Sequence, residues 1–245
     1  MALPKEYTWE TKIASFDADE KRQLRLSSQL KLQQEVGEHH LAAGGVFYHR
    51  LYEDVFVFVL TKASSILYRL PRFEEPVNLT TWSRGTKGIH FFRCYRFTDG
   101  DGNVLIDSIT SFALVDAKTH KLLRPVEFDR YGPYHQPDKT NSCELPSKLK
   151  LPEGLTVVTE RILRYSDIDY NGHLNNAVYG DFLCDYMPGG MTGKKITAFD
   201  IGFLHEAFLG DTIVISALSQ GNTVFLKGEH DRGVCFEARC CYETE

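Results

Sequence analysis

Apolar and polar residues alternate along several segments of the chain, and a period of two is typical of strands with one buried face. In the first half this pattern predicts an extended segment over residues 7–16 and strands over 56–68, 77–84, 89–97 and 104–115. Before these strands we expect a helix that begins near Ser27 and Ser28 and ends at Gly44, because glycine accepts the left-handed conformation there. The face of this helix that we expect to pack comprises Leu32, Val36, His39, His40 and Ala43.

The second half repeats this order of elements. We expect an extended segment over 156–165, a helix from about Leu174 to Tyr186, and strands over 197–204, 212–219, 223–231 and 234–242. An extended segment, one helix and an antiparallel meander wrapped around that helix are the elements of a hotdog unit. The pattern therefore predicts the α+β class, with two tandem hotdog units, each a long helix wrapped by an antiparallel β-sheet.

The segment between the halves has a different composition. Residues 132–155 show no hydrophobic period and contain four prolines among polar residues: Pro133, Pro137, Pro146 and Pro152. Such a segment is typical of a linker that crosses the surface. We therefore predict an N-terminal unit over residues 1–131, a linker over 132–155 and a C-terminal unit over 156–245.

Composition narrows the class of protein. The chain has 245 residues, of which 42% are hydrophobic and 25% charged, as in ordinary globular proteins with a core. Its net charge of -5 argues against general nucleic-acid binding, and its longest apolar run, Val55–Leu60, is too short to cross a membrane. Residues 1–6 resemble neither a signal peptide nor a transit peptide, and the six cysteines form no Cys-x-x-Cys pair. We therefore expect a cytoplasmic protein with reduced thiols and without a metal or cofactor site.

Chemistry is suggested by Asp169, Asn171 and His173, which occupy alternate positions and so point to one side of an extended or looped backbone. They precede the second predicted helix, whose first amides, around His173 to Asn175, would favour developing negative charge. Such a set suits attack on a carbonyl group. The alternative interpretation is that Asp169 and Asn171 only start a turn and that Asn175 caps the helix.

A further carboxylate, Glu206, lies at the end of an otherwise apolar strand. Burying a charged carboxylate there costs free energy unless the group is hydrogen-bonded or its pKa is shifted, and such groups are functional candidates. Alternatively, Glu206 faces solvent and Gly210 and Asp211 form a turn. Overlaying the halves at Thr212 and Val77 places Glu206 opposite Pro71, and the first helix start, residues 27–32, shows no counterpart of the polar motif. We therefore expect only the second half to carry chemistry.

These motifs together resemble the acyl–acyl-carrier-protein thioesterases of plant plastids and bacteria over nearly the whole chain. The matching segments are Asp169-x-Asn171-x-His173-x-Asn175-Asn176-x-x-Tyr179, Glu206 with Gly210-Asp211, Trp82–Gly85, Phe91–Arg93, Asp99–Val104 and Val115–Pro125. The resemblance implies a tandem double hotdog that hydrolyses acyl carrier protein thioesters in fatty acid biosynthesis. It also implies a catalytic set made of Asp169, Asn171, His173 and Glu206, with acyl carrier protein as the partner.

The chain departs from the plant pattern at one position, because plant members commonly have a cysteine where Ala207 stands. Cys184 cannot replace it, since a helix would place it about 16 Å along the axis from His173. We expect instead that Asp169 and Glu206 activate or hold a water and orient His173, which transfers the proton, while Asn171 positions the carbonyl or the water. Which carboxylate is the base, and whether Asp169 attacks directly, stays open.

Two other functions remain in competition with this one: a hotdog coenzyme A thioesterase, and a non-catalytic acyl-binding protein. Binding an acidic carrier requires a local basic patch. The candidates are Lys118, Lys121, Arg124, Lys148, Lys150, Lys194 and Lys195. The N-terminal unit, with Val36 and Val57 among its apolar positions, is expected to form the acyl-chain pocket. We expect no nucleic-acid or membrane partner, and the sequence is compatible with a homodimer.

Overall fold

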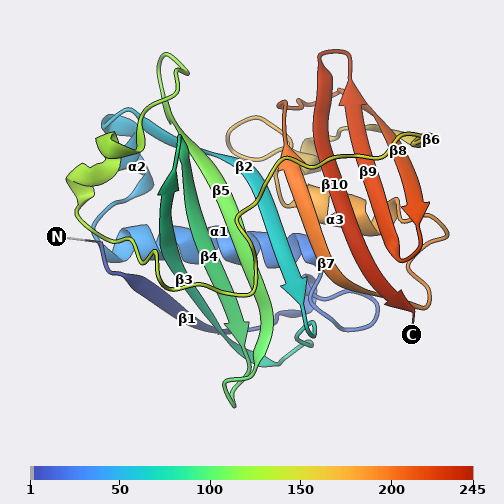
Figure 1. Ribbon diagram of the computed structural model, residues 1–245, viewed down its shortest axis with the longest axis horizontal. Helices are drawn as coiled ribbons and strands as arrows, with labels where there is room; N and C mark the ends of the chain where they lie inside the picture. The colour runs from blue at the N-terminus through green and yellow to red at the C-terminus, as the bar shows by residue number, and fades with distance from the viewer. Residues whose placement is uncertain (1–2, 245) are drawn as a thin grey trace. The chain divides into compact units, whose positions relative to one another are not determined.

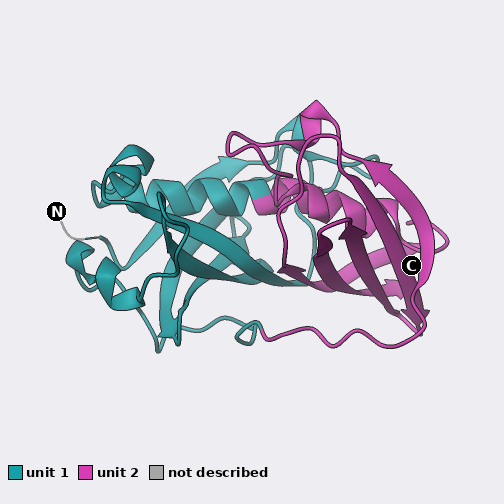
Figure 2. Ribbon diagram, turned by 90° about the horizontal axis from the view of Figure 1, so that it is seen from above, with its two compact units in different colours: residues 1–24, 31–146 teal, residues 25–30, 147–245 magenta. Residues whose placement is uncertain are grey.

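The protein forms two compact units in the computed structural model, which describes residues 3–244 (Figures 1 and 2). Unit 1 runs from the N-terminus to Leu24 and from Lys31 to Pro146. Unit 2 consists of Arg25–Leu30 together with the chain from Ser147 onward. The change of unit after Pro146 falls inside the segment predicted as a linker.

Unit 1 contains one antiparallel sheet with the strand order β1-β3-β4-β5-β2. Its strands are β1 (Glu6–Lys12), β2 (Phe56–Leu67), β3 (Pro76–Lys87), β4 (His90–Thr98) and β5 (Val104–Asp116). The helix α1 (Leu26–Ala43), of 18 residues, runs along one face of this sheet, as Figure 1 shows. Shorter elements are a 3-10 turn at Ser15–Asp17, the helix α2 (Tyr48–Glu53) and a 3-10 helix at Pro125–Tyr131.

Unit 2 contains a second antiparallel sheet with the order β7-β10-β9-β8-β6. Its strands are β6 (Thr156–Ile162), β7 (Lys194–Phe203), β8 (Thr212–Gln220), β9 (Thr223–His230) and β10 (Gly233–Thr244). The helix α3 (Val178–Asp185) packs on this sheet through Tyr179 and Phe182, whose rings lie 4.9 and 5.8 Å from that of Phe236. The predicted α+β class and tandem hotdog units are confirmed.

The second helix differs from its prediction. It begins at Val178, not at Leu174, and has eight residues, so the expected long helix is present only in the first repeat. The reason lies in two amides that a continuous helix would leave free: Leu174 N–H donates to the Ala207 carbonyl at 2.7 Å, and Asn175 N–H to the Asp167 carbonyl at 2.9 Å. These bonds hold the chain before α3 in a loop.

Residues 25–30 belong to unit 2 because α3 passes very close to them. A Cβ placed on Gly180 would lie 2.7 Å from the backbone nitrogen of Ser27 and 2.8 Å from the carbonyl carbon of Leu26. No real Cβ sits that close to a backbone atom, so only glycine permits this crossing.

Packing along α1 follows the predicted face in part. Val36 and His40 are fully buried, whereas Ala43, expected on the same face, is exposed. The Arg93 guanidinium donates to His40 Nδ1 at 2.8 Å, and His40 Nε2 lies 2.8 Å from the Pro4 carbonyl. Since arginine only donates, Nδ1 is the acceptor and the proton of the neutral ring is on Nε2. Burial, reinforced by Arg93, lowers the pKa of His40 to about 4.

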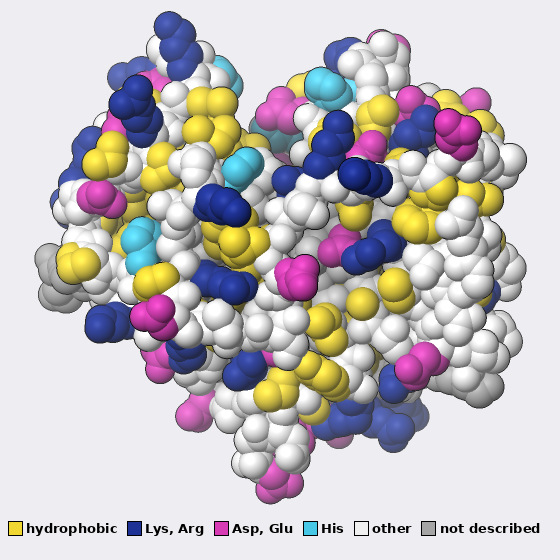
Figure 3. Space-filling model, in the orientation of Figure 1, with side chains coloured by type: hydrophobic (Ala, Val, Ile, Leu, Met, Phe, Trp, Pro, Cys, Tyr) yellow, Lys and Arg dark blue, Asp and Glu magenta, His cyan; other side chains and the backbone are white. Residues whose placement is uncertain are grey.

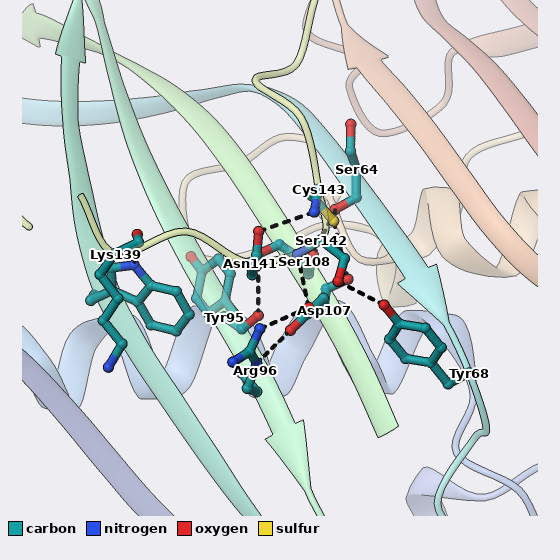
Figure 4. Close-up of polar contacts among 11 residues, drawn as sticks. Ser64, Tyr68, Tyr95, Arg96, Asp107, Ser108, Lys139, Asn141, Ser142 and Cys143 are labelled. Atoms are coloured by element: carbon teal, nitrogen blue, oxygen red, sulfur yellow. Dashed lines mark hydrogen bonds and ion pairs between the residues drawn. The ribbon is translucent and has the colours of Figure 1, made fainter. Parts of the chain in front are cut away.

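The sheet face of unit 1 opposite α1 is covered by residues 139–143, here called the strap (Figure 4). The carbonyl of Lys139 accepts from Trp82 Nε1 at 2.7 Å, and Asn141 Nδ2 donates to the Ser108 carbonyl at 2.8 Å. Ser142 N–H donates to the Asp107 carboxylate at 2.9 Å. The strap thus belongs to unit 1, although the sequence places it in the linker.

Asp107, which receives the strap, is 1% exposed. Its carboxylate accepts two bonds from Arg96, at 2.7 and 2.9 Å. Burial alone would raise its pKa, but the bonds from Arg96 and Ser142 outweigh burial and lower it. Asp107 is therefore held as a carboxylate in the folded protein.

Candidate active site

Residues 169–173 form a closed loop between β6 and α3. Asp169 N–H donates to the His173 carbonyl at 2.9 Å, and Gly172 N–H donates to the Asp169 carbonyl at 3.0 Å. The carboxylate of Asp169 accepts from Asn171 N–H at 2.8 Å. Gly172 has a φ of 85°, a conformation that glycine adopts without strain. One oxygen of Asp169 therefore closes this turn, which is the structural role that the alternative interpretation of the motif assigns to Asp169.

Glu206 follows the end of β7, on the segment that leads to β8. The bond from Leu174 N–H to the Ala207 carbonyl joins this segment to the loop and brings Glu206 beside His173. Their side chains approach to 3.7 Å between His173 Nε2 and Glu206 Oε1. At that distance the two side chains do not form a hydrogen bond, but contacts between catalytic groups are often this long before a substrate binds.

The surroundings of this pair are half open. The side chain of His173 is 33% exposed and that of Glu206 59%. The ring of Phe208 stands edge-on to the His173 imidazole, with 5.6 Å between centroids. The imidazole is thus supported on an apolar side while a reactant can reach its polar edge.

The four residues of the predicted set are not equally placed. His173 and Glu206 are neighbours, whereas Asp169 and Asn171, although they alternate with His173 in the sequence, do not join this contact. Within residues 3–244, neither the Asp169 nor the Asn171 side chain forms a hydrogen bond or ion pair with His173 or Glu206. Asn171 is exposed on the rim of the loop.

The prediction that amides around His173 to Asn175 bind developing negative charge is wrong for two of them. Leu174 N–H and Asn175 N–H both donate to backbone carbonyls, so neither is available to a substrate. The side chain of Asn175 accepts from Ala177 N–H at 2.9 Å and closes a turn just before α3. The N-cap of α3 is Ala177, which makes no side-chain cap bond, so the alternative in which Asn175 caps the helix is wrong.

Sequence reasoning missed His230, the last residue of β9. Its side chain is 1% exposed, and its Nε2 lies 3.0 Å from the backbone carbonyl of Glu206. In the sequence His230 starts a hairpin turn, and only the register of β9 against β10 places it behind Glu206.

Asp211, expected to be only a turn residue, also holds this segment. Its carboxylate accepts from Phe208 N–H at 2.7 Å and pairs with Arg232. Burial raises the pKa of Asp211, but the bonds from Arg232 and Phe208 outweigh this effect and lower it.

Unit 1 contains the same loop without its chemistry. Asp19 N–H donates to the Gln23 carbonyl at 2.8 Å, Arg22 N–H to the Asp19 carbonyl at 3.0 Å, and the Asp19 carboxylate accepts from Lys21 N–H at 2.9 Å. Leu24 N–H donates to the Pro71 carbonyl at 2.9 Å, as Leu174 does to Ala207. The equivalent positions are Asp19 and Asp169, Lys21 and Asn171, Gln23 and His173, and Leu70 and Glu206.

This equivalence corrects two expectations. The counterpart of the motif exists at residues 19–23, before α1, and not at residues 27–32 where the sequence overlay sought it. Glu206 corresponds to Leu70 and not to Pro71, because the overlay missed the register by one residue. The expectation that unit 1 has no equivalent of the motif is therefore wrong for Asp169, whose counterpart is Asp19, but His173 and Glu206 are replaced there by Gln23 and Leu70.

No group of His, Cys, Asp and Glu in the described part of the chain is arranged to hold a metal ion. None of the six cysteines, all of which lie within the described residues, forms a disulfide. Among residues 3–244 we find no helix of the length and apolarity needed to cross a membrane.

Comparison with known proteins gives the relatives of this chain. Residues 4–132 match the model of the acyl-ACP thioesterase N-terminal domain, and residues 156–234 match that of the C-terminal domain. A chloroplastic acyl-[acyl-carrier-protein] hydrolase of Cuphea viscosissima is 25% identical over 138 residues, which cover 54% of this chain and 33% of that protein. The chain thus spans about a third of the length of this curated relative.

Solved structures share the fold along the whole chain. An acyl-ACP thioesterase of Bacteroides thetaiotaomicron superposes with a TM-score of 0.87 at 21% identity, covering 98% of each chain. The 12:0-ACP thioesterase of Umbellularia californica does so with a TM-score of 0.84 at 18% identity, again covering 98% of each. With both of its halves matched by the family's domain models, this chain belongs to the acyl-ACP thioesterase family.

Proposed function

We propose that this protein hydrolyses the thioester between an acyl chain and acyl carrier protein and releases a free fatty acid. Membership of the acyl-ACP thioesterase family supports the reaction. The observation that carries it is the approach of His173 Nε2 to Glu206 Oε1, 3.7 Å, on an accessible loop. An imidazole held by a carboxylate is a standard arrangement for proton transfer at neutral pH.

In the proposed mechanism His173 takes a proton from a water, whose oxygen attacks the thioester carbonyl carbon. Glu206 orients the ring and stabilises the imidazolium that forms. Collapse of the tetrahedral intermediate breaks the carbon–sulfur bond, and His173 returns the proton to the departing thiolate. Asn171, an exposed residue of the loop, would position the carbonyl or the water. Asp169 is the second carboxylate of the proposed set, and its oxygen that does not bond to Asn171 N–H would act there.

The decisive experiment compares hydrolysis of matched acyl carrier protein and coenzyme A thioesters across chain lengths. We expect higher kcat/KM with the carrier protein. A higher value with coenzyme A at every length would favour a coenzyme A thioesterase. Tight acyl binding without turnover of either series would show an acyl-binding protein.

We also propose that a local basic patch receives the acidic carrier. On the face shown in Figure 3, basic, acidic and hydrophobic side chains are interspersed, so that face presents both signs of charge. Lys118, Lys121 and Arg124 are exposed and close in sequence. Lys194 is the weakest candidate because its ammonium group donates to the Pro188 carbonyl at 2.9 Å.

The acyl chain is proposed to lie in unit 1, where Val36 of α1 is fully buried. Substituting Val36 or the half-buried Val57 should move the preferred chain length by one or two steps, since a methylene is worth only about 1–3 kcal/mol in an apolar pocket. An unchanged profile there, with a shift from substitutions at Val178 or Phe182, would assign the pocket to unit 2. Placement in the cytoplasm and assembly as a homodimer stay predictions.

A further inference from the structure

His230 is a buried histidine that the proposed mechanism does not use. Its side chain is 1% exposed, and both ring nitrogens are engaged by the backbone. Arg232 N–H lies 3.1 Å from Nδ1, and the Glu206 carbonyl lies 3.0 Å from Nε2.

These two contacts show which ring nitrogen donates and which accepts. A backbone N–H only donates, so Nδ1 is an acceptor, and the carbonyl of Glu206 only accepts, so Nε2 carries the proton. His230 therefore donates one hydrogen bond to the main chain of Glu206 and accepts one from Arg232 N–H. The neighbouring charges are Asp231, whose carboxylate lies 3.7 Å from Nδ1, and the Asp211–Arg232 pair on the adjoining segment.

Three of the bonds that hold the segment carrying Glu206 act at residues 206–208. Leu174 N–H holds the Ala207 carbonyl, the Asp211 carboxylate holds Phe208 N–H, and His230 holds the Glu206 carbonyl. Only the last acts on the residue whose carboxylate faces His173.

The corresponding segment of unit 1, which has Leu70 in place of Glu206, shows which of these bonds the fold alone requires. It keeps the first two fastenings: Leu24 N–H donates to the Pro71 carbonyl at 2.9 Å, and the Glu75 carboxylate accepts from Arg72 N–H at 2.8 Å. In the described part of unit 1 the Leu70 carbonyl receives only the guanidinium of the adjacent Arg69, at 3.5 Å, which is too long for a strong bond. A buried histidine therefore holds this carbonyl only in unit 2, where the residue is Glu206 and not Leu70.

We propose that His230 is a positioning residue that fixes the main chain of Glu206 and thereby directs its carboxylate at His173. The proposal rests on the proposed roles of His173 and Glu206. In metal sites, loss of a partner that orients a ligating side chain typically lowers affinity or activity 10- to 100-fold, and misplacement of a catalytic group by about 1 Å can lower the rate about 100-fold. We expect an effect of this order here.

Two substitutions separate the contacts of the ring. Glutamine places an N–H donor where Nε2 stands, so His230→Gln should keep the bond to Glu206 and retain kcat within about threefold. The asparagine side chain reaches only as far as the position of Nδ1. His230→Asn therefore keeps an acceptor for Arg232 N–H but loses the hydrogen bond to the Glu206 carbonyl. We expect His230→Asn to lower kcat about 10- to 100-fold with KM nearly unchanged.

A double-mutant cycle tests whether the effect passes through Glu206. In a Glu206→Gln background, adding His230→Asn should lower kcat by less than about twofold. Full kcat in His230→Asn, or an equal further loss in the Glu206→Gln background, would overturn the proposal. Equal losses in the Gln and Asn variants at unchanged melting temperature would overturn it too.

A measurement without substrate keeps this proposal distinct from the proposed function. The ¹⁵N chemical shifts of the His173 ring report its contact with Glu206. We expect His230→Asn to move them toward those of Glu206→Gln, and His230→Gln to leave them near wild type. Unmoved shifts in His230→Asn refute the positioning role even if the enzyme is active. The expected movement supports it even if no carrier thioester is hydrolysed.

Discussion

Asp19 and Asp169 close the same turn in the two halves of the chain. In each, the carboxylate accepts from the amide two residues further on, at 2.9 and 2.8 Å, and the aspartate N–H donates to the carbonyl four residues on. The two units differ at two equivalent positions: the last loop residue is Gln23 in unit 1 and His173 in unit 2, and the residue on the segment bonded to the loop is Leu70 in unit 1 and Glu206 in unit 2. The loop is thus a property of the fold, while the candidate chemistry depends on the residues at these two positions.

Asp169 therefore has a structural role that does not depend on the imidazole of His173. An aspartate that makes the same bonds in a loop without an imidazole has a structural role by itself. The bond to Asn171 N–H needs only an acceptor oxygen, not a negative charge, so Asp169 can be tested separately from His173 and Glu206.

The largest effect should come from the residues that distinguish the loops. His173→Ala should lower kcat by two orders of magnitude or more, in line with loss of a general acid–base group. The matched change in unit 1, Gln23→Ala, should leave kcat within about threefold, and Cys184→Ala should stay near wild type. Steady-state kinetics with one acyl carrier protein thioester measures all three. Full activity in His173→Ala, or an inactive but folded Cys184→Ala, would contradict the assignment.

A smaller loss is expected at the aspartate the loops share. Asp169→Ala should lower kcat about 100-fold because the turn loses its acceptor, whereas Asp169→Asn, whose side-chain oxygen still accepts, should retain kcat within about tenfold. The control is Asp19→Ala, which should lower the melting temperature but not kcat. If Asp169→Asn is as inactive as Asp169→Ala, the charge is required and Asp169 is the base or the nucleophile.

Stability should depend on pH through a group found in unit 1. The folded-state pKa of His40, about 4, lies below the ordinary 6.5, so the unfolded chain binds the proton first. Stability is therefore fully present above pH 6.5 and falls as the pH decreases toward 4, by about 2 kcal/mol between pH 6.5 and 5. Denaturant titrations of wild type and His40→Gln measure this; the variant should show a flatter profile. Identical slopes would assign the dependence elsewhere.

The smallest effects should come from the left-handed residue of each loop. Arg22 and Gly172 both have positive φ, 58° and 85°. Gly172→Ala should destabilise the protein by about 1 kcal/mol, whereas Arg22→Gly should change stability by less than about 1 kcal/mol, since relief of backbone strain offsets the greater freedom of the unfolded chain. Thermal unfolding of both variants gives the comparison. A larger loss from Arg22→Gly than from Gly172→Ala would show that the two loops are not equivalent in energy.

Much of the fold could be predicted from the sequence because alternation and turn residues are local signals. The strands of both sheets arise near their expected positions, and the double hotdog was predicted from their order. The late start of α3 could not be predicted, because it depends on the carbonyls of Asp167 and Ala207, which only the folded chain brings to Leu174 and Asn175.

The candidate site shows the same limit. His173 and Glu206 could be named from the motif and the resemblance, but not their distance. The loop at residues 19–23 escaped notice because Lys21 and Gln23 share no chemistry with Asn171 and His173. The spacing Asp17-x-Asp19, repeated as Asp167-x-Asp169, was the available signal. His230 could not be found, since its role arises from strand register.

The strap has a practical consequence for anyone who divides this chain into fragments. A fragment ended at Tyr131, where the second 3-10 helix stops, would uncover Trp82 and take the Ser142 amide away from Asp107. One ended at Pro146 would keep both partners and the thiol of Cys143 that packs with Trp82, Cys94 and Ile109. For expression, labelling or proteolysis, the N-terminal piece ends where its covering segment ends, not where its last regular element does.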